Sequence, residues 1–157
     1  MRIFALDIGA RRVGVARSNK EETLALPFEV VVRTGDHGRD LGAVISLLEE
    51  EQCDGVVIGL PLGLRGGLTD QARVVLDEAC ELAEKLACSV WLWDERLSSA
   101  EAMRRAHDVG QSERSMRGKL DAAAASIILE DFLGAGDRDR YGEPRAFRAR
   151  LDTVVEQ

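Results

Sequence analysis

The chain has 157 residues, of which 45% are hydrophobic and 31% charged, as is typical of one globular domain with its own core. Its formal net charge of −7 disfavours nonspecific nucleic-acid binding through bulk charge, although local basic patches are compatible with that charge. Three cysteines, an odd number without a Cys-x-x-Cys pair, disfavour a disulfide framework or zinc knuckle. With no signal peptide or membrane-spanning stretch recognisable, we expect a protein of the reducing cytoplasm.

The first part of the chain predicts three antiparallel strands. Apolar runs separated by glycine, asparagine and charged residues are typical of strands joined by turns. The predicted strands span about residues 2–8, 13–18 and 24–33. Pro27 falls early in the third strand, which an edge strand tolerates because one side of its backbone has no partner.

Helices and strands then alternate. Apolar residues recur at helical spacing in two segments, and two short apolar runs predict strands, the first of them buried on both faces. Thr69 or Asp70 can cap the second helix. The predicted elements are a helix at about 41–51, a strand at 55–60, a helix at 72–86 and a strand at 90–93.

The segment that follows the fifth strand predicts a short helix and a loop. Ser98 and Glu101 have the spacing of a capping box, so we predict a helix from Ser98 to about His107. Residues 110–115 are polar and contain glycine and serine, which is typical of a flexible loop.

A last helix is predicted over about residues 116–133, and the glycines that follow end it. We therefore expect one domain over residues 1–135. Residues 136–157 form an arginine-rich C-terminal tail with few apolar residues, for which both a partial helix and a flexible chain are open.

The order of the predicted elements is β-β-β-α-β-α-β-α-α, which predicts an α/β domain with a mixed sheet flanked by helices. Three antiparallel strands followed by right-handed crossovers give a five-stranded sheet of order 3-2-1-4-5. This arrangement is that of the RNase H-like folds.

Three acidic residues stand where a neutral or solvent-facing residue would be usual. Asp7 ends the first strand, Glu95 follows the fifth, and Asp121 lies beside the apolar stripe of the last helix. Taken alone, Asp7 equally fits a turn aspartate that is satisfied by nearby backbone. Because open α/β sheets bind ligands at the carboxyl ends of their strands, a helix crossing the sheet would bring Asp121 to the other two acids.

Convergent carboxylates repel one another, and a divalent cation removes that penalty. Mg²⁺ prefers hard oxygen ligands, and Mn²⁺ is the alternative. Two such ions about 4 Å apart can clamp the attacking and leaving oxygens of a phosphodiester. The three acids, with no histidine cluster beside them, therefore predict metal-assisted phosphodiester hydrolysis.

The predicted strand order places a geometric demand on Glu95. Strand five lies two places from strand one, so Glu95 must reach back about 10 Å across the end of strand four. That end, at Gly59, carries no acid and leaves room. Asp94 is the competing ligand, and strand alternation puts it on the face opposite to Glu95.

Four motifs stand out along the chain: Asp7-Ile8-Gly9 with Arg12 to Ala16, Gly59 to Leu62, Asp94 to Ser99, and Lys119 to Ala124. Over about residues 1–134 they resemble, in the same order, the motifs of the YqgF family, also called RuvX. The resemblance implies an RNase H-like fold and a metal-dependent nuclease, with Asp7, Glu95 and Asp121 as metal-binding catalytic acids. The family is associated with 5′-end maturation of pre-16S ribosomal RNA and with resolution of branched DNA.

The loop after Leu62 departs from the family pattern. It usually resembles Asn-Met-Asp-Gly-Ser, whereas this chain has Gly63-Leu64-Arg65-Gly66-Gly67. No side-chain contact of that loop is therefore transferred from the family.

Four basic residues in or beside these motifs are candidates for phosphate contacts: Arg12, Arg65, Arg96 and Lys119. Such contacts position a nucleic acid without reading its sequence. Aromatic residues make up only 4% of the chain, and we expect Trp91 and Trp93 in the core. Recognition of structured RNA or branched DNA is therefore favoured over stacking on single strands.

Several functional hypotheses stay open at this stage. The first is a nuclease of pre-16S ribosomal RNA, with a Holliday junction resolvase or branched-DNA repair nuclease as the alternative. A resolvase is expected to act as a dimer, and the sequence, which shows no clear dimer patch, fits a monomer or weak homodimer. Other classes are an ATP-binding domain of the actin and sugar-kinase kind, which normally needs two such domains, and a non-catalytic nucleic-acid or ribosome-assembly factor.

Overall fold

The computed structural model describes residues 1–63, 67–95 and 114–155, with side chains for all of these except 114–121 and 154–155. The strands are β1 (Ile3–Ile8), β2 (Arg12–Ser18), β3 (Ala25–Val32), β4 (Gly55–Leu60) and β5 (Ser89–Asp94). The helices are α1 (His37–Glu50), α2 (Asp70–Lys85), α4 (Arg114–Gly134) and α5 (Pro144–Val155).

The five strands form one sheet in the order β3-β2-β1-β4-β5, which confirms the predicted order. β1 pairs antiparallel with β2, and β2 with β3, whereas β4 and β5 run parallel to β1. β1 and β4 are buried along their whole length, which confirms the burial on both faces predicted for β4 from its unbroken apolar sequence. Pro27 lies in β3, an edge strand, where a missing N–H costs least.

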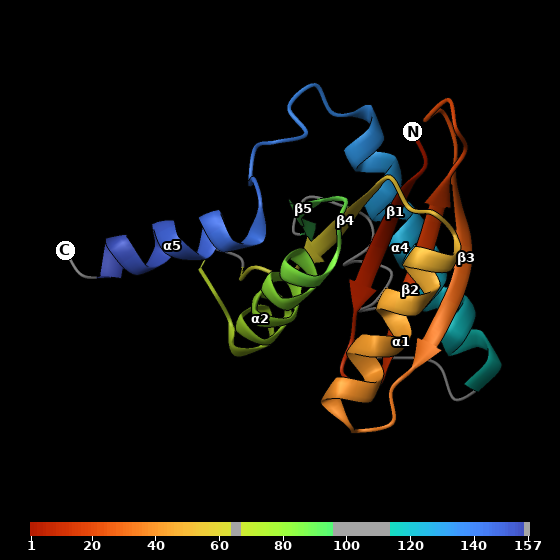
Figure 1. The fold of residues 1–157 in the computed structure, drawn as a ribbon, viewed down its shortest axis with the longest axis horizontal. Helices are drawn as coiled ribbons and strands as arrows, with labels where there is room; N and C mark the ends of the chain where they lie inside the picture. Colours follow the sequence, from red (N-terminus) through yellow and green to blue (C-terminus); the bar gives the residue numbers. More distant parts are fainter. Residues whose placement is uncertain (64–66, 96–113, 156–157) are drawn as a thin grey trace.

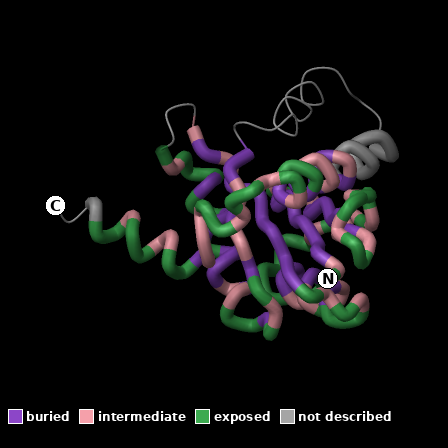
Figure 2. Tube along the Cα trace, turned by 90° about the horizontal axis from the view of Figure 1, so that it is seen from above, coloured by how far each residue is buried: buried purple, intermediate pink, exposed green. Residues whose placement is uncertain are grey.

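Helices cover both faces of the sheet, so the domain has three layers (Figure 1). α1 and α2 pack on one face, over a core that includes Phe4, Leu6, Leu48 and Leu82. α4 crosses the other face, where a second core joins the sheet to Ile128, Leu129 and Phe132 of the helix. Figure 2 shows the buried residues concentrated in this central part and few of them in α5.

A capping side chain fixes the start of α1 and of α2, the two helices that pack on the same face of the sheet. Of the two candidates for α2, Thr69 is the cap, since its Oγ1 accepts a hydrogen bond of 3.1 Å from the N–H of Ala72. Asp36 caps α1 in the same way, accepting from the N–H of Arg39 at 3.0 Å. α1 therefore starts at His37, some four residues before the segment predicted from its apolar stripe.

The predicted loop over residues 110–115 is wrong at its end. α4 already includes residues 114 and 115, so the last helix begins at Arg114, two residues before the predicted start. Helical spacing of apolar residues marks only the packed part of a helix, and a polar first turn gives no such signal. The predicted helix over 98–107 and the rest of that loop lie outside the described residues.

The segment after α4 docks on the free edge of β5. The N–H of Leu92 donates to the carbonyl of Gly142 at 3.2 Å, and Trp91 Nε1 donates to Asp139 at 2.8 Å. Of the two possibilities open for the tail, the structure has the helix, because α5 spans Pro144–Val155. α5 packs its first turns against α2 and then extends away from the sheet (Figure 1). Within the described ranges, no helix has both the length and the apolar character that crossing a membrane requires.

Candidate functional site

Asp7 is a buried carboxylate in the penultimate position of β1, where only 3% of its surface is exposed. Ala5 and Ile3, two and four residues earlier, belong to the core under α4. Because side chains alternate along a strand, Asp7 faces the same side of the sheet as α4. A carboxylate is costly to bury in an apolar strand, so its presence there calls for a compensating partner such as a cation.

Glycines flank Asp7 on both neighbouring strands. Gly14 of β2 is its direct antiparallel partner. On the other side, Leu6 pairs with Ile58, and continuing that register by one residue puts Gly59 beside Asp7, about 4.8 Å away. Neither neighbour has a side chain, so neither flanking strand places a side chain directly beside the Asp7 carboxylate.

Glu95 fills the space above Gly59. A Cβ atom on Gly59 would lie 2.9 Å from Glu95 Cδ and closer still to its Oε1. Glu95 follows β5 directly, so its side chain crosses the end of β4 toward β1, as the strand order requires. The carboxylate is 1% exposed and lies against Ile128 of α4, whose Cδ1 is 2.7 Å from the same Cβ position. The structure therefore brings Glu95 and Asp7 to the same small area on the α4 side of the sheet.

Asp94 lies on the opposite face. Alternation along β5 puts it with Val90 and Leu92, which belong to the core under α1 and α2. Tyr141, from the segment docked on β5, donates its hydroxyl to Asp94 Oδ2 at 3.4 Å. Asp94 is thus buried in a different environment from its neighbour Glu95, which disfavours it as a shared ligand with Asp7.

Asp121 belongs to α4, and its side chain lies outside what the structure describes. Its backbone is seven residues, or two helical turns, before Ile128, the residue that reaches Gly59. Figure 1 shows that α4 begins at the edge of the sheet where β1 and β3 end. The convergence of Asp121 with Asp7 and Glu95 stays a prediction.

Arg12 is the candidate phosphate contact that the structure describes in full. It follows the β1–β2 turn, which is closed by a 2.9 Å hydrogen bond from the N–H of Gly9 to the carbonyl of Arg12. A Cβ on Gly9 would also be only 2.9 Å from that carbonyl, so the turn requires glycine there. Gly14 is the partner of Asp7, and Arg12 lies two residues before Gly14 in the same strand. The half-buried Arg12 side chain therefore lies on the same face of the sheet as Asp7.

The other three basic candidates are not tested. Arg65 and Arg96 lie outside the described residues. Lys119 is in α4, but its side chain is likewise outside the described part. Their phosphate contacts stay predictions.

The donor set fits a hard divalent cation. Asp7 and Glu95 supply carboxylate oxygens, which are the ligands that Mg²⁺ and Mn²⁺ prefer, and Gly59 places no side chain between them. Among the described side chains, no group of three acidic, histidine or cysteine residues is placed to hold a metal ion. That search leaves out the third predicted ligand, Asp121.

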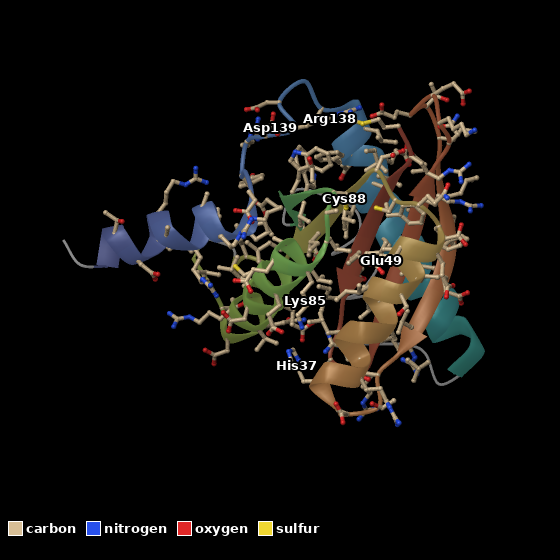
Figure 3. The ribbon with its side chains drawn as sticks, viewed as in Figure 1. His37, Glu49, Lys85, Cys88, Arg138 and Asp139 are labelled. Atoms are coloured by element: carbon tan, nitrogen blue, oxygen red, sulfur yellow. The ribbon has the colours of Figure 1, made fainter. Side chains whose placement is uncertain are left out.

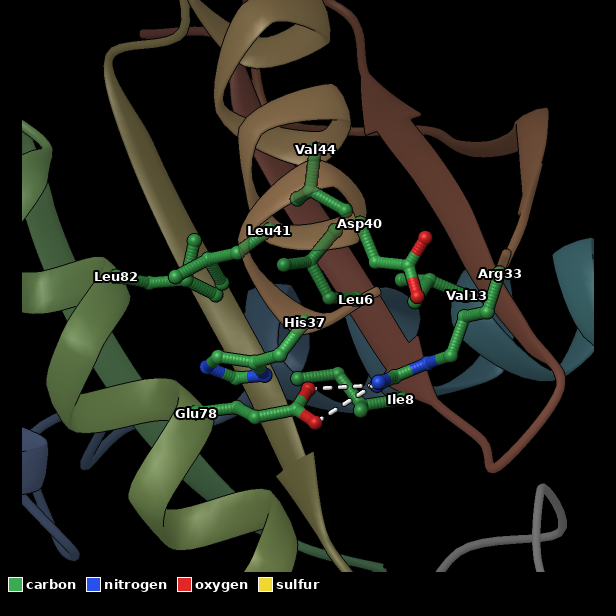
Figure 4. Close-up of a pocket in the computed structure, with 10 residues that line it drawn as sticks. All are labelled: Leu6, Ile8, Val13, Arg33, His37, Asp40, Leu41, Val44, Glu78 and Leu82. Atoms are coloured by element: carbon green, nitrogen blue, oxygen red, sulfur yellow. Dashed lines mark hydrogen bonds and ion pairs between the residues drawn. The ribbon is translucent and has the colours of Figure 1, made fainter. Parts of the chain in front are cut away.

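A second charged cluster, which the sequence did not indicate, lies on the other face of the sheet between α1 and α2 (Figure 4). Arg33 makes a bidentate ion pair with Glu78, at 2.8 and 2.6 Å, beside a cavity of about 10 Å³. The hydrogen bonds that Arg33 donates to Glu78 raise the pKa of Arg33 above its ordinary value. Space for about one water molecule and a bidentate ion pair indicate a structural role.

The strand order, with helices on both faces, defines the class: the protein has an RNase H-like fold. Among solved structures, the chain is similar to Thermus thermophilus RuvC in complex with a Holliday junction substrate, with a TM-score of 0.51. The two chains are 18% identical, and the match covers 98% of this chain and 97% of that one. At this identity the likeness concerns the fold.

Sequence relatives identify the family. The "Putative pre-16S rRNA nuclease" of Chloroflexus aurantiacus is 38% identical over 133 residues, which are 85% of this chain and 86% of that protein. A protein of the same name from Anaeromyxobacter sp. is 38% identical over 133 residues, covering 96% of its length. A sequence model of the RuvX family, described as Holliday junction resolvase, matches residues 1–135. This chain therefore belongs to the RuvX family.

Proposed function

We propose that this protein is a metal-dependent nuclease that hydrolyses phosphodiester bonds in the 5′-end maturation of pre-16S ribosomal RNA. The observation that carries the proposal is the pair of buried carboxylates, Asp7 and Glu95, gathered around Gly59 on one face of the sheet. Membership of a family named for nuclease and resolvase activities supports the same chemistry. A nuclease of ribosomal RNA precursors works in the cytoplasm, which is the location we propose.

The proposed catalytic acids are Asp7, Glu95 and Asp121, which would hold Mg²⁺ or Mn²⁺. When bound, such an ion supplies an activated water at neutral pH and stabilises the negative charge that develops on phosphate oxygens. The fold fixes the positions of these ligands. Asp7 belongs to a fully buried central strand, and the Glu95 side chain packs over Gly59 beside Ile128. Pre-organised ligands of this kind need little rearrangement during the reaction.

Arg12 is proposed to position the substrate. It lies at the carboxyl edge on the Asp7 face, where a guanidinium can contact a phosphate next to the one being cleaved. Arg65, Arg96 and Lys119 are proposed to extend this contact along the backbone. The overall charge of −7 makes such a local cluster the means of attracting a polyanion.

The second candidate substrate is a four-way DNA junction, which the description of the matching family model favours. The two candidates differ in what they require of the assembly. Symmetric cleavage of a junction needs two active sites related by a twofold axis, whereas trimming of an RNA precursor needs one.

The test is a cleavage panel with a 5′-extended 16S RNA precursor, duplex DNA and a four-way DNA junction, each with Mg²⁺, Mn²⁺ or a chelator. We expect metal-dependent cleavage of the RNA by a protein that behaves as a monomer or weak homodimer in sizing. Preferential junction cleavage by a stable dimer would favour the second candidate. Binding without cleavage under any of these conditions would contradict both and favour a non-catalytic assembly factor.

A further inference from the structure

Two cysteines that are far apart in the sequence meet at the edge of the sheet opposite the carboxylates. Cys53 comes two residues before β4, and Cys88 comes directly before β5. β4 and β5 are parallel neighbours, with Gly55 paired to Ser89, so both thiols lie at the amino ends of adjacent strands. Figure 3 shows Cys88 near this edge, away from His37 at the start of α1.

The two sulfur atoms are in contact. Their separation is 3.9 Å, and the Cys53 thiol also lies 3.2 Å from the carbonyl oxygen of Gly55. Both side chains are half-buried, so a small molecule in solution can reach them. The sulfurs need to approach only from 3.9 Å to about 2.0 Å to bond.

The backbone on the Cys53 side is held in place by hydrogen bonds. The N–H of Cys53 donates to Leu48 at the end of α1, at 3.1 Å. Asp54 makes two hydrogen bonds with Arg2, the residue before β1. The N–H of Asp54 donates to the carbonyl of Arg2 at 3.1 Å, and the N–H of Arg2 donates to the Asp54 carboxylate at 2.8 Å. Cys53 is therefore presented to Cys88 by a rigid turn, as a specific modification site requires.

We propose that Cys53 and Cys88 form a dithiol modification site that reacts with small-molecule disulfides, such as oxidised glutathione, to give an intramolecular disulfide. The proposal does not rest on the nuclease function, because it concerns the other end of the strands. Six residues of β5, about 20 Å of extended chain, separate Cys88 from Glu95.

The electrostatics of the pair assign the attacking sulfur. The hydrogen bond from Cys53 lowers the pKa of Cys88 to about 7, so that a large fraction of this thiol is ionised at neutral pH. The same hydrogen bond is the largest cause of a raised pKa of Cys53, and burial of its thiol is the second. Asp54 opposes ionisation of both thiols. The third cysteine, Cys80, is buried in the core, and burial raises its pKa, which makes it unreactive.

The reaction balances without a further reagent. The Cys88 thiolate attacks one sulfur of oxidised glutathione, forms a mixed disulfide and releases one glutathione thiolate. Cys53 then loses its proton and attacks Cys88 Sγ, which releases the second glutathione. The protein loses two electrons and two protons, and one glutathione disulfide is reduced to two thiols.

The test exposes the native protein to oxidised glutathione, followed by counting of free thiols and peptide mapping. We expect the free thiols to fall from the three in the chain to one, with Cys53 and Cys88 joined in a single chain. Because the disulfide closes the segment that contains α2, the melting temperature should rise by about 5 °C or more.

Three variants make the result specific. Cys80→Ser is the matched control and should form the same cross-link. Cys53→Ser should stop at the mixed disulfide and carry one glutathionyl group on Cys88, whereas Cys88→Ser should react much more slowly. The proposal is overturned if the folded protein keeps three free thiols, if the bond joins two chains, or if it includes Cys80.

Discussion

The carboxylate of Glu95 occupies the space where a side chain on Gly59 would stand. This contact links the residue after β5 to the centre of the sheet, because Gly59 is the neighbour of Asp7 in β4. A glycine at this position is therefore a requirement of the site: any Cβ would displace either Glu95 or Ile128. The two acids can share one area only because the strand between them carries no side chain at that point.

Gly59→Ala should impair both the fold and the site. Since the added methyl overlaps Glu95 and Ile128, we expect a loss of about 1 to 3 kcal/mol in unfolding free energy and a large loss of cleavage. Chemical denaturation with a double-mutant cycle measures this: in a Glu95→Ala background the same change should cost at least about 0.5 kcal/mol less.

Gly42→Ala is the control for that prediction. Gly42 lies in α1 with no atom within 4 Å of its added Cβ, so alanine should stabilise the helix by up to about 1 kcal/mol. If Gly59→Ala were as well tolerated as Gly42→Ala, the placement of Glu95 over β4 would be incorrect.

Arg12→Gln should weaken nucleic-acid binding to all sequences alike. Removing one phosphate contact lowers the slope of log affinity against log salt concentration by about 1, because one fewer counterion is released. Fluorescence anisotropy at several salt concentrations measures the slope. Arg39→Gln, an exposed arginine of α1 on the opposite face, should leave it unchanged. Equal slopes for the parent and Arg12→Gln would remove Arg12 from the interface.

Glu78→Gln should destabilise the fold without touching the carboxylate site. Glu78 and Arg33 are only 10% and 14% exposed, so losing one partner leaves a buried guanidinium uncompensated, at a cost of about 3 kcal/mol. The control is Asp77→Asn on the same helix, which breaks the exposed pair with Arg148 and should cost less than about 1 kcal/mol. Similar denaturation midpoints for the two variants would show that the Arg33 pair is not a structural anchor.

His37 should titrate above its ordinary pKa of 6.5. Its exposed ring lies 2.9 Å from Glu81, and the hydrogen bond to that carboxylate raises the pKa of His37. A raised pKa in the folded state means that the pair stabilises the protein fully below pH 6.5 and loses this effect as pH rises through the raised value. An NMR titration of the His37 ring measures the pKa. Glu81→Gln should return it to about 6.5, and an unraised pKa in the parent protein would contradict the contact.

Much of this architecture is readable from the sequence, because it depends on local patterns. The order of the predicted elements, with right-handed crossovers, was sufficient for the strand order, and alternation along β5 put Asp94 and Glu95 on opposite faces. Four motifs carried the family resemblance over about residues 1–134, and the match of the RuvX family model to residues 1–135 confirms it.

What the sequence did not predict depends on how distant segments pack. Arg33 and Glu78 are 45 positions apart, and only the relative placement of β3 and α2 makes them partners. The thiols of Cys53 and Cys88 meet for the same reason, through the register of β4 and β5. Tyr141 reaches Asp94 because the segment after α4 docks on the edge of β5, which no periodic pattern in that segment indicates.

The central claim is that Asp7 and Glu95 act together as metal-binding catalytic acids, and single-turnover cleavage in saturating Mn²⁺ tests it most directly. Asp7→Asn and Glu95→Gln should each lower the rate constant by about 100-fold or more while keeping substrate affinity and the folded state. Asp94→Asn, the neighbouring buried acid on the other face, should stay near the parental rate. If Asp7→Asn cuts as fast as the parent, the proposed active site is wrong.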